Sequence, residues 1–194
     1  MKPVPSLILA SGSIYRKQLL ERLDIAFSVE AADIDETPLE GEPPEALVSR
    51  LAAAKAEAVA RQHPEAAVFG LDQVAELDGR ALGKPGSEDN ARQQLAQLSG
   101  RTVWFRSGIC LHLPGGKTDV RRSDIRVDFR DLDKAEIQRY VERDRPLDCA
   151  GSFRSETLGA SLVRAIRSDD PTALMGLPLI TVCAMLRSAG WQLP

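Results

Sequence analysis

Histidine and cysteine are scarce in this chain of 194 residues, and their scarcity narrows its possible chemistry. With only His63 and His112, a histidine-based metal site or a Ser-His-Asp triad has little to draw on. The three cysteines are odd in number, far apart and not in Cys-x-x-Cys pairs, which argues against a disulfide framework and a structural zinc site. We therefore expect any catalysis to depend on carboxylates, lysines and arginines.

Long apolar runs and a strong charge of one sign are missing too. The N-terminal segment MKPVPSLILASGS has one lysine and only the short run LILA, too short for a signal peptide or a membrane span. We expect a cytoplasmic protein without a membrane partner. A net charge of −3 argues against a nucleic-acid partner. The composition, 43% hydrophobic and 27% charged, is that of an ordinary globular protein, and we expect one domain over 1–194.

Apolar runs and turn residues alternate along the chain as in an α/β protein. Strands are expected over 7–10, 27–29, 66–71, 74–77, 80–82, 102–113 and 118–129. Helices are expected over 14–23, 44–61, 88–98, from Asp131 or Asp133 to about 142, and from about 177 onward. These elements predict a mixed sheet with flanking helices. The consecutive long strands suggest a second lobe, so we expect two lobes around a central cleft that binds the ligand.

Arg16 falls where the helical pattern calls for an apolar side chain. It precedes Leu19 and Leu20 by three and four residues, in the first turn of the expected helix. Together with the backbone N–H groups that follow the turn Ser11–Ser13, it describes an anion site at a helix N-terminus. The alternative is that Arg16 reaches solvent or pairs with a nearby acid such as Glu36.

Lys55 shows the same anomaly in the second expected helix. It follows Leu47 and Leu51 at steps of four, on a face that is otherwise apolar. A lysine in such a place is costly unless it is paired. The alternative is a lysine at the edge of the apolar face that reaches water.

Three further candidates follow from their local context. Asp72 is expected at the end of an apolar strand, where ligands of α/β proteins gather, although it could simply stabilise a turn. Asp35 and Glu36 form an acidic pair suited to Mg²⁺ or Mn²⁺, or to solvent. Lys84, between a glycine and a proline, could reach a phosphate or stay solvated. Cations and carboxylates without histidine suit the hydrolysis of a phosphoric anhydride.

The order of several segments resembles the Maf family of nucleotide pyrophosphatases nearly from end to end. These segments are LILASGSIYRKQLL, DIDETP, RLAAAKAEAVA, GLDQVAELDGRALGKP, CAGSFRSE and MGLPL. The resemblance implies the Maf-like (anticodon-binding/ITPase-like) fold. It also implies a hydrolase that attacks the α-phosphorus of a nucleoside triphosphate and releases a nucleoside monophosphate and pyrophosphate. A divalent cation (Mg, Mn or Co) would be the cofactor, and a homodimer is an expectation from the family alone.

The resemblance also implies roles for particular residues. Asp72 matches the proton acceptor that activates water, and it would share the metal with Glu36, although Asp35 remains open as the alternative ligand. The positions that match the phosphate- and metal-binding cleft are Ser11, Arg16, Glu36, Lys55 and Lys84. The positions that tune the choice of base are Tyr15, Gln73 and Glu156.

Within the family, LDQV, GSFRSE and the aromatic Tyr15 resemble the branch that hydrolyses 7-methyl-GTP. The branch acting on dTTP and UTP usually has threonine after the aspartate and arginine at the position of Tyr15. A 7-methylated guanine is cationic, so the ring of Tyr15 and the carboxylate of Glu156 should favour it. Tyr15 could otherwise be a packing residue and Glu156 a solvated acid. The alternatives are a dTTP/UTP or broader noncanonical-nucleotide pyrophosphatase, or a nucleotide-binding regulator of cell division.

Three positions depart from the usual pattern. Ile14 stands where a proline is usual after the second serine, which could loosen the start of the helix. Lys17 stands at the basic position after Arg16, and the SGxTH segment of the family reads Ser99-Gly100-Arg101-Thr102-Val103 here, with valine in place of the histidine. None of these changes removes the expected base or the expected phosphate cations.

Overall fold

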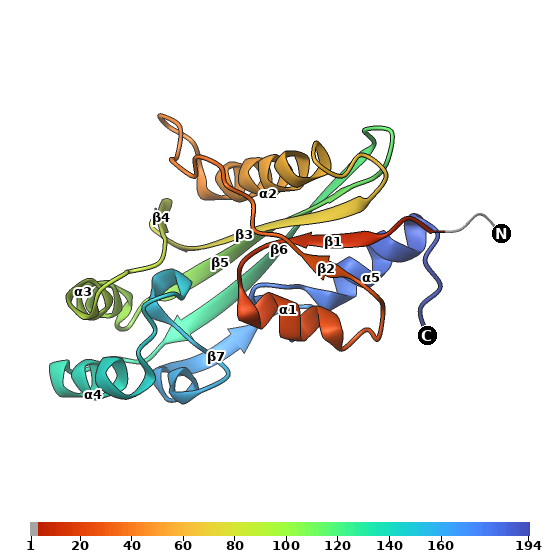
Figure 1. Ribbon diagram of the computed structural model, residues 1–194. Helices are drawn as coiled ribbons and strands as arrows, with labels where there is room; N and C mark the ends of the chain where they lie inside the picture. Colours follow the sequence, from red (N-terminus) through yellow and green to blue (C-terminus); the bar gives the residue numbers. More distant parts are fainter. Residues whose placement is uncertain (1–3) are drawn as a thin grey trace. The chain divides into compact units, whose positions relative to one another are not determined.

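The computed structural model describes residues 4–194 and confirms an α/β fold (Figure 1). Residues 1–3, which begin the N-terminal segment considered above, lie outside the described residues. The strands are β1 (Leu7–Ala10), β2 (Ser28–Val29), β3 (Ala67–Leu77), β4 (Arg80–Leu82), β5 (Thr102–His112), β6 (Thr118–Phe129) and β7 (Val163–Arg167). The α-helices are α1 (Ile14–Glu21), α2 (Pro44–Ala60), α3 (Glu88–Leu98), α4 (Lys134–Asp144) and α5 (Leu179–Ser188). Short 3₁₀ helices are η1 (Ala150–Ser152), η2 (Leu158–Leu162) and η3 (Ala173–Met175).

The strands form one mixed sheet in the order β2-β1-β3-β5-β6-β7, with β4 paired to β3. Strand β1 runs parallel to both of its neighbours, β2 and β3. The pairs β3–β4 and β6–β7 are antiparallel. The turn between β3 and β4 has positive φ at Asp78 (51°) and Gly79 (75°), the backbone of the hairpin that the Asp-Gly pair predicts.

The chain divides into two compact units that share the three long strands. The first unit comprises Met1–Asp72, Ser107–Ser123 and Asp170–Pro194. The second comprises Gln73–Arg106 and Asp124–Asp169. The expectation of a ligand cleft between two lobes stays a prediction.

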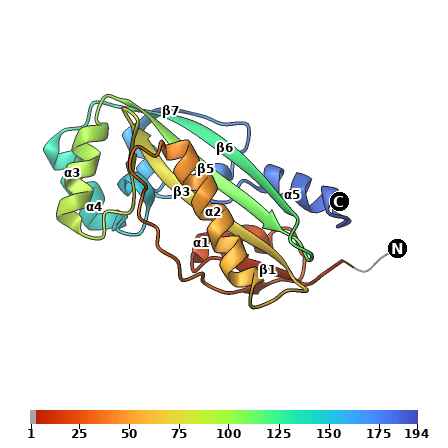
Figure 2. The same ribbon diagram turned by 90° about the horizontal axis from the view of Figure 1, so that it is seen from above.

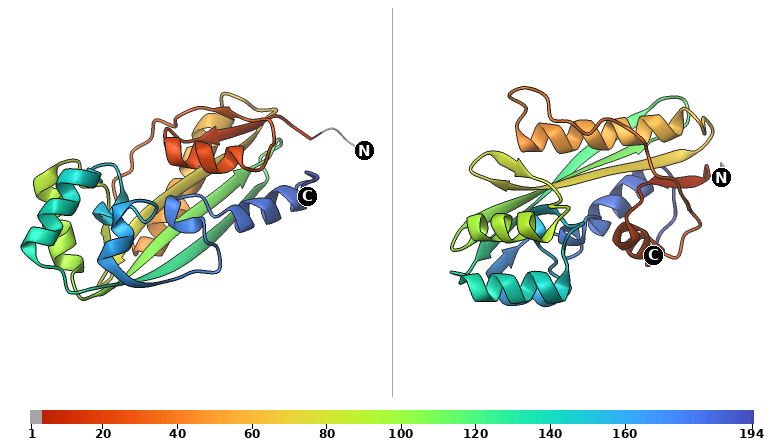
Figure 3. Two further views of the ribbon diagram at one scale, coloured as in Figure 1. Left: turned by 90° about the horizontal axis from the view of Figure 1, so that it is seen from below. Right: turned by 60° about the vertical axis from the view of Figure 1, so that its left-hand side comes forward.

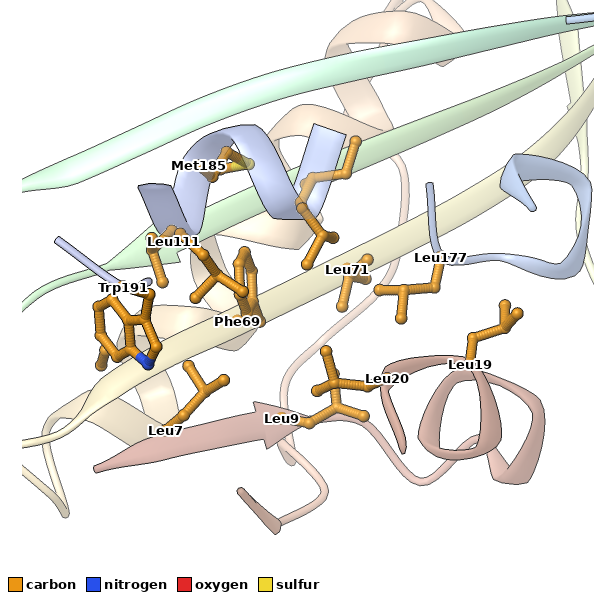
Figure 4. Close-up of a cluster of buried hydrophobic side chains, with 14 residues drawn as sticks. Leu7, Leu9, Leu19, Leu20, Phe69, Leu71, Leu111, Leu177, Met185 and Trp191 are labelled. Carbon is orange, nitrogen blue, oxygen red and sulfur yellow. The ribbon is translucent and has the colours of Figure 1, made fainter. Parts of the chain in front are cut away.

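In the first unit, apolar side chains of β1 and β3 pack against α1 and α5. Figure 4 shows Leu9, Phe69 and Leu71 of the strands in one buried cluster with Leu20 of α1 and Met185 of α5. The remaining members of this cluster are Leu7, Leu19, Ala67, Ile109, Leu111, Leu177, Val182, Leu186 and Trp191. This core fixes the position of α1, whose first turn carries Arg16.

Helix α2 packs on the opposite face of the same strands, as the view from above shows (Figure 2). Two glycines permit its close approach. A Cβ added at Gly70 of β3 would lie 2.1 Å from the carbonyl oxygen of Ala52, and one at Gly108 would lie 2.1 Å from that of Val48. The helix therefore lies almost directly on the strand backbones.

In the second unit, α3 and α4 lie side by side (Figure 3). Asp133 and Glu136 form a capping box at the start of α4, in agreement with the expected helix start. Phe153 packs against Phe105 and Phe129, with ring centroids 5.7 and 5.2 Å apart. These contacts give the second unit an apolar core of its own.

Two expectations about strands are wrong. Strand β3 does not end at residue 71: it continues through Asp72 to Leu77, because residues beyond Asp72 are also buried and pair with β4. Asp72 therefore lies within a strand and not at its carboxyl end. Strand β7 was not expected, since its sequence VRAIR has two arginines among five residues and pairs only at the edge of the sheet.

All three cysteines are free thiols. Over residues 4–194, no helix has the length and apolar character needed to cross a membrane.

Candidate active site

Lys55 lies between two carboxylates in the first unit. Its Nζ is 2.7 Å from Oδ1 of Asp72 and 2.8 Å from Oε1 of Glu36. Lys55 and Asp72 are buried, with 8% and 7% of their surfaces exposed, whereas the side chain of Glu36 is 58% exposed. Lys55 is therefore paired, as burial of a lysine requires, and the alternative that it reaches water is wrong.

The packing of α2 on β3 creates this contact. Lys55 lies on the buried face of α2, and its neighbour Ala56 lies against Gly70. Because no side chain separates helix and strand at Gly70, Lys55 lies within reach of Asp72, two residues further along β3. Asp72 does not stabilise a turn, since it is part of the strand.

Arg16 is held by backbone carbonyls. Its Nε donates to the carbonyl of Gly176 over 3.1 Å, and its Nη1 donates to the carbonyl of Leu71 over 2.9 Å. Nη1 also lies 3.4 Å from Oγ of Ser11. Burial lowers the pKa of the Arg16 guanidinium, while the charges of Asp72 and Glu36 act to raise it. Arg16 is thus in the field of both carboxylates, although its hydrogen bonds go to carbonyls.

The segment before α1 supplies the rest of an anion-binding geometry. Ser13 caps the helix by accepting from the backbone N–H of Arg16, and Oγ of Ser11 accepts from the N–H of Ser13. Ile14 begins the helix and is exposed, so the absence of proline does not delay the helix start. A helix N-terminus with an adjacent arginine is suited to an anion such as a phosphate.

The loop that carries Glu36 is fixed from its far side. Arg50 on α2 binds Glu42 through two hydrogen bonds, 2.6 and 2.7 Å long, and donates to the carbonyl of Thr37 over 3.1 Å. These bonds hold the pKa of the Glu42 carboxyl at about 2. Hydrogen bonding from the Thr37 side chain, and from the Thr37 N–H that Asp35 Oδ1 accepts, lowers the pKa of the Asp35 carboxyl. Of the two neighbouring acids, Glu36 is the one bonded to Lys55 beside Asp72.

The carboxylates of the site can be compared with the ligands that the expected metal ion needs. Over residues 4–194, no three side chains of histidine, cysteine, aspartate or glutamate gather to hold a metal ion. Glu36 and Asp72 do contact one common cation, the Lys55 ammonium. Two carboxylates supplemented by substrate phosphate oxygens are a usual set for Mg²⁺. The residues present therefore fit a metal that arrives with a phosphate ligand.

The other expected site residues are distributed between the units. Tyr15 lies in α1 next to Arg16 and is half-buried. Gln73 follows Asp72 on β3 and is half-buried, Lys84 is exposed in the loop after β4, and Glu156 is exposed in the segment after η1; all three belong to the second unit. Their roles stay predictions from the family resemblance.

Sequence reasoning missed the groups that hold the site residues in place. The carbonyls of Leu71 and Gly176 bind Arg16, and the fork of Arg50 on Glu42 secures the Glu36 loop. A backbone carbonyl leaves no signal in a sequence. The pair Glu42 and Arg50 has an eight-residue spacing that matches no local motif, so only the fold brings it together.

The fold makes this chain an α/β protein. Its candidate site combines a buried carboxylate, the lysine bonded to it and an arginine at a helix N-terminus, and such a site is suited to a phosphorylated ligand. The family model described as "Maf-like protein" matches residues 6–189, and the chain belongs to this family.

Curated relatives cover nearly the whole chain. A protein of Cupriavidus pinatubonensis named 7-methyl-GTP pyrophosphatase is 52% identical over 97% of this chain and 96% of its own length. A protein of the same name from Xanthomonas oryzae pv. oryzae is 53% identical over 98% of this chain and all of its own length. Among solved structures, the Staphylococcus aureus Ham1 protein is 21% identical, with a TM-score of 0.48 over 65% of this chain and 72% of that chain.

Proposed function

We propose that this chain is a nucleoside triphosphate pyrophosphatase that hydrolyses 7-methyl-GTP to 7-methyl-GMP and pyrophosphate. The observation that carries the proposal is the buried Asp72 carboxylate, bonded to Lys55 and within the field of Arg16. Relatives that are about half identical over nearly their full length and named for this activity support it. We place the enzyme in the cytoplasm, and a homodimer is part of the proposal on the family resemblance.

In this proposal, Asp72 accepts a proton from the water that attacks the α-phosphorus. The new bond joins the water oxygen to the α-phosphorus, and the bond from that phosphorus to the bridging oxygen breaks. Pyrophosphate leaves with the bonding electron pair. Arg16 stabilises negative charge on the phosphates, and its fixed guanidinium needs no rearrangement to do so.

A divalent cation would be held by Glu36 and Asp72 together with phosphate oxygens. When bound, it supplies positive charge that polarises the phosphoryl group. Glu36 is accessible for this role because its side chain is 58% exposed. Lys55, which now bridges the two carboxylates, would be available to the phosphates once a metal shares them.

Recognition of the base is assigned to Tyr15, Gln73 and Glu156. An aromatic ring and a carboxylate favour a cationic 7-methylguanine over a neutral base. This assignment rests on the family resemblance. Its test is the double change Tyr15→Arg and Gln73→Thr, which should move the preference from 7-methyl-GTP toward dTTP and UTP. An unchanged order of substrates would contradict it.

The decisive experiment measures products from 7-methyl-GTP, GTP, dTTP and UTP with Mg²⁺, Mn²⁺ or Co²⁺, and after addition of EDTA. We expect pyrophosphate as the leaving product, the highest kcat/KM for 7-methyl-GTP, and loss of turnover with EDTA. In water enriched in ¹⁸O, the label should enter 7-methyl-GMP. Orthophosphate release, or label in pyrophosphate, would refute attack on the α-phosphorus.

Asp72→Asn tests the base. We expect kcat to fall by at least about 100-fold, as the loss of a general base usually produces. Asp89→Asn is the matched control, since Asp89 is an exposed residue in the first turn of α3 and its loss should leave kcat unchanged. Near-normal turnover of Asp72→Asn would remove Asp72 from this role. Tight nucleotide binding by the wild-type chain without turnover of any substrate would favour a binding regulator instead.

A further inference from the structure

Asp170 is a buried carboxylate that the proposed chemistry does not use. Only 4% of its surface is exposed. Its Oδ1 accepts from the N–H of Thr172 over 2.9 Å and lies 2.6 Å from the hydroxyl of the same residue. Its Oδ2 accepts from the N–H of Ile180 over 2.7 Å. Asp170 thus joins the two ends of the segment 172–180.

Thr172 provides a further hydrogen bond between the two ends of this segment. Its Oγ1 accepts from the N–H of Leu179, the first residue of α5, over 2.9 Å. Pro178 precedes the helix and provides no side-chain cap. The first two amides of α5 are therefore satisfied by Thr172 and Asp170, and a carboxylate near a helix N-terminus is additionally favoured by the helix dipole.

The segment closed by these bonds presents one carbonyl to the candidate site. It contains η3 and then Gly176, whose φ of 93° reverses the chain direction. The carbonyl of Gly176 accepts from Nε of Arg16. The next side chain, Leu177, is fully buried and points into the apolar cluster shown in Figure 4. The carbonyl is thus fixed by the Asp170 tie on one side and by the core on the other.

An arginine that binds anions is affected by whether its hydrogen-bond partners in the protein are charged or neutral. A carboxylate partner would cancel the charge of Arg16, whereas carbonyl oxygens orient the guanidinium and leave its full positive charge. Two carbonyls, of Gly176 and Leu71, do this. The carbonyl of Leu71 is set by the sheet, because β3 pairs with β1 up to Gly70. The carbonyl of Gly176 lies outside any strand, and its position depends on the segment that Asp170 closes.

We propose that Asp170 is a positioning residue for Arg16, acting through Thr172 and the Gly176 carbonyl. This inference rests on the proposed function for its consequence, which is tight binding of the substrate phosphates. Asp170 touches no substrate. Without its carboxylate, the Gly176 carbonyl and the guanidinium lose their fixed orientation, and the affinity for phosphates falls.

The test uses the full chain and inorganic tripolyphosphate in the presence of Mg²⁺, and binding is measured by calorimetry and needs no turnover. Asp170→Asn keeps the shape of the side chain, but its amide group must face a backbone N–H. We expect about tenfold weaker binding. Asp133→Asn is the matched control, because Asp133 caps α4 in the second unit by accepting from the N–H of Glu136. We expect both changes to lower Tm and only Asp170→Asn to weaken binding.

A thermodynamic cycle separates positioning from general stability. In an Arg16→Ala background, Asp170→Asn should change tripolyphosphate binding by less than about twofold, since its effect passes through the missing arginine. A second readout needs no ligand: the Nε–H of Arg16 should exchange with solvent faster in Asp170→Asn, observed by NMR, and at the wild-type rate in Asp133→Asn.

The inference is overturned by wild-type binding and exchange in Asp170→Asn, by equal losses in the two aspartate variants, or by an undiminished effect without Arg16. It is also overturned if the wild-type chain does not bind tripolyphosphate. Failure of the proposed function looks different: no nucleotide is hydrolysed while Asp170 and Arg16 remain coupled in tripolyphosphate binding. Hydrolysis of 7-methyl-GTP with an uncoupled Asp170 would retain the function and refute the positioning role.

Discussion

Replacing Lys55 with methionine should destabilise the fold through a charge that it leaves behind. Methionine fills similar space, so the main loss is the ammonium bonded to Asp72 and Glu36. Because Asp72 is 7% exposed, its carboxylate cannot recover the lost interaction from water. Removing one partner of a buried ion pair costs about 3–5 kcal/mol. The nearby charge of Arg16 compensates in part. We therefore expect about 3 kcal/mol at neutral pH.

Two companion variants locate the source of the loss. Glu36→Gln removes the exposed partner of Lys55 and should cost less than about 1 kcal/mol, as for other solvent-exposed ion pairs. Adding Asp72→Asn to Lys55→Met removes the stranded charge, because an amide is neutral. The double variant should be at least about 1 kcal/mol more stable than Lys55→Met alone.

The measurement is urea unfolding of the four proteins at pH 7, with the free energy of unfolding extrapolated to water. Circular dichroism reports the helices, and coincident transitions at several wavelengths check that one free energy describes the change. If Lys55→Met costs less than about 1 kcal/mol, or if adding Asp72→Asn destabilises it further, the pair is not the buried partnership described above.

Three further predictions concern packing, pH and thiol reactivity. Gly70→Ala should cost about 3 kcal/mol in urea unfolding, because its Cβ would lie 2.1 Å from a backbone oxygen of α2, whereas Gly83→Ala, which meets no atom within 4 Å, should cost less than about 1 kcal/mol. Arg50 lowers the pKa of Glu42 from 4.5 to about 2, so the pair stabilises the fold above pH 4.5 and loses this effect as the pH falls toward 2. Stability measured between pH 6 and 3 should accordingly fall less steeply in Arg50→Met than in the wild type; equal slopes would contradict the pairing. Burial raises the pKa of the Cys110 thiol to about 11, so iodoacetamide at pH 8 should alkylate it roughly 100-fold more slowly in the native chain than in urea, by mass spectrometry.

The sequence predicted those parts of the fold that depend on local pattern. Ser87 and Asp133 cap the helices that were expected to begin near them, and Asp78 with Gly79 makes the expected hairpin turn. The expected end of strand β3 at residue 71 was wrong, because a polar residue such as Asp72 is typical of the position after a buried strand. Its burial instead depends on Lys55, which is distant in sequence.

The candidate site was predictable where a charge interrupted an apolar pattern. Lys55 and Arg16 were found in this way: Lys55 is bonded to the Asp72 carboxylate, and Arg16 lies within the field of its charge. What they bond to could not be found, because backbone carbonyls and loop geometry have no residue-specific signal. Asp170 was missed for the opposite reason: an Asp-Asp-Pro-Thr segment is typical of an exposed turn, and only the tertiary structure buries one of its carboxylates.

The charges of the candidate site bear directly on why a metal belongs in the proposal. Arg16 and Lys55 carry two positive charges, while Asp72 and Glu36 carry two negative ones, so the four side chains together are neutral. A triphosphate carries several negative charges. Four side chains whose charges sum to zero can orient it through individual contacts, but they exert no net electrostatic attraction on it. A divalent cation shared by the two carboxylates would make the set positive and would release Lys55 from them. Lysine and metal would then be successive partners of the same acids, and affinity for triphosphate should rise with metal concentration more steeply in the wild type than in Glu36→Gln.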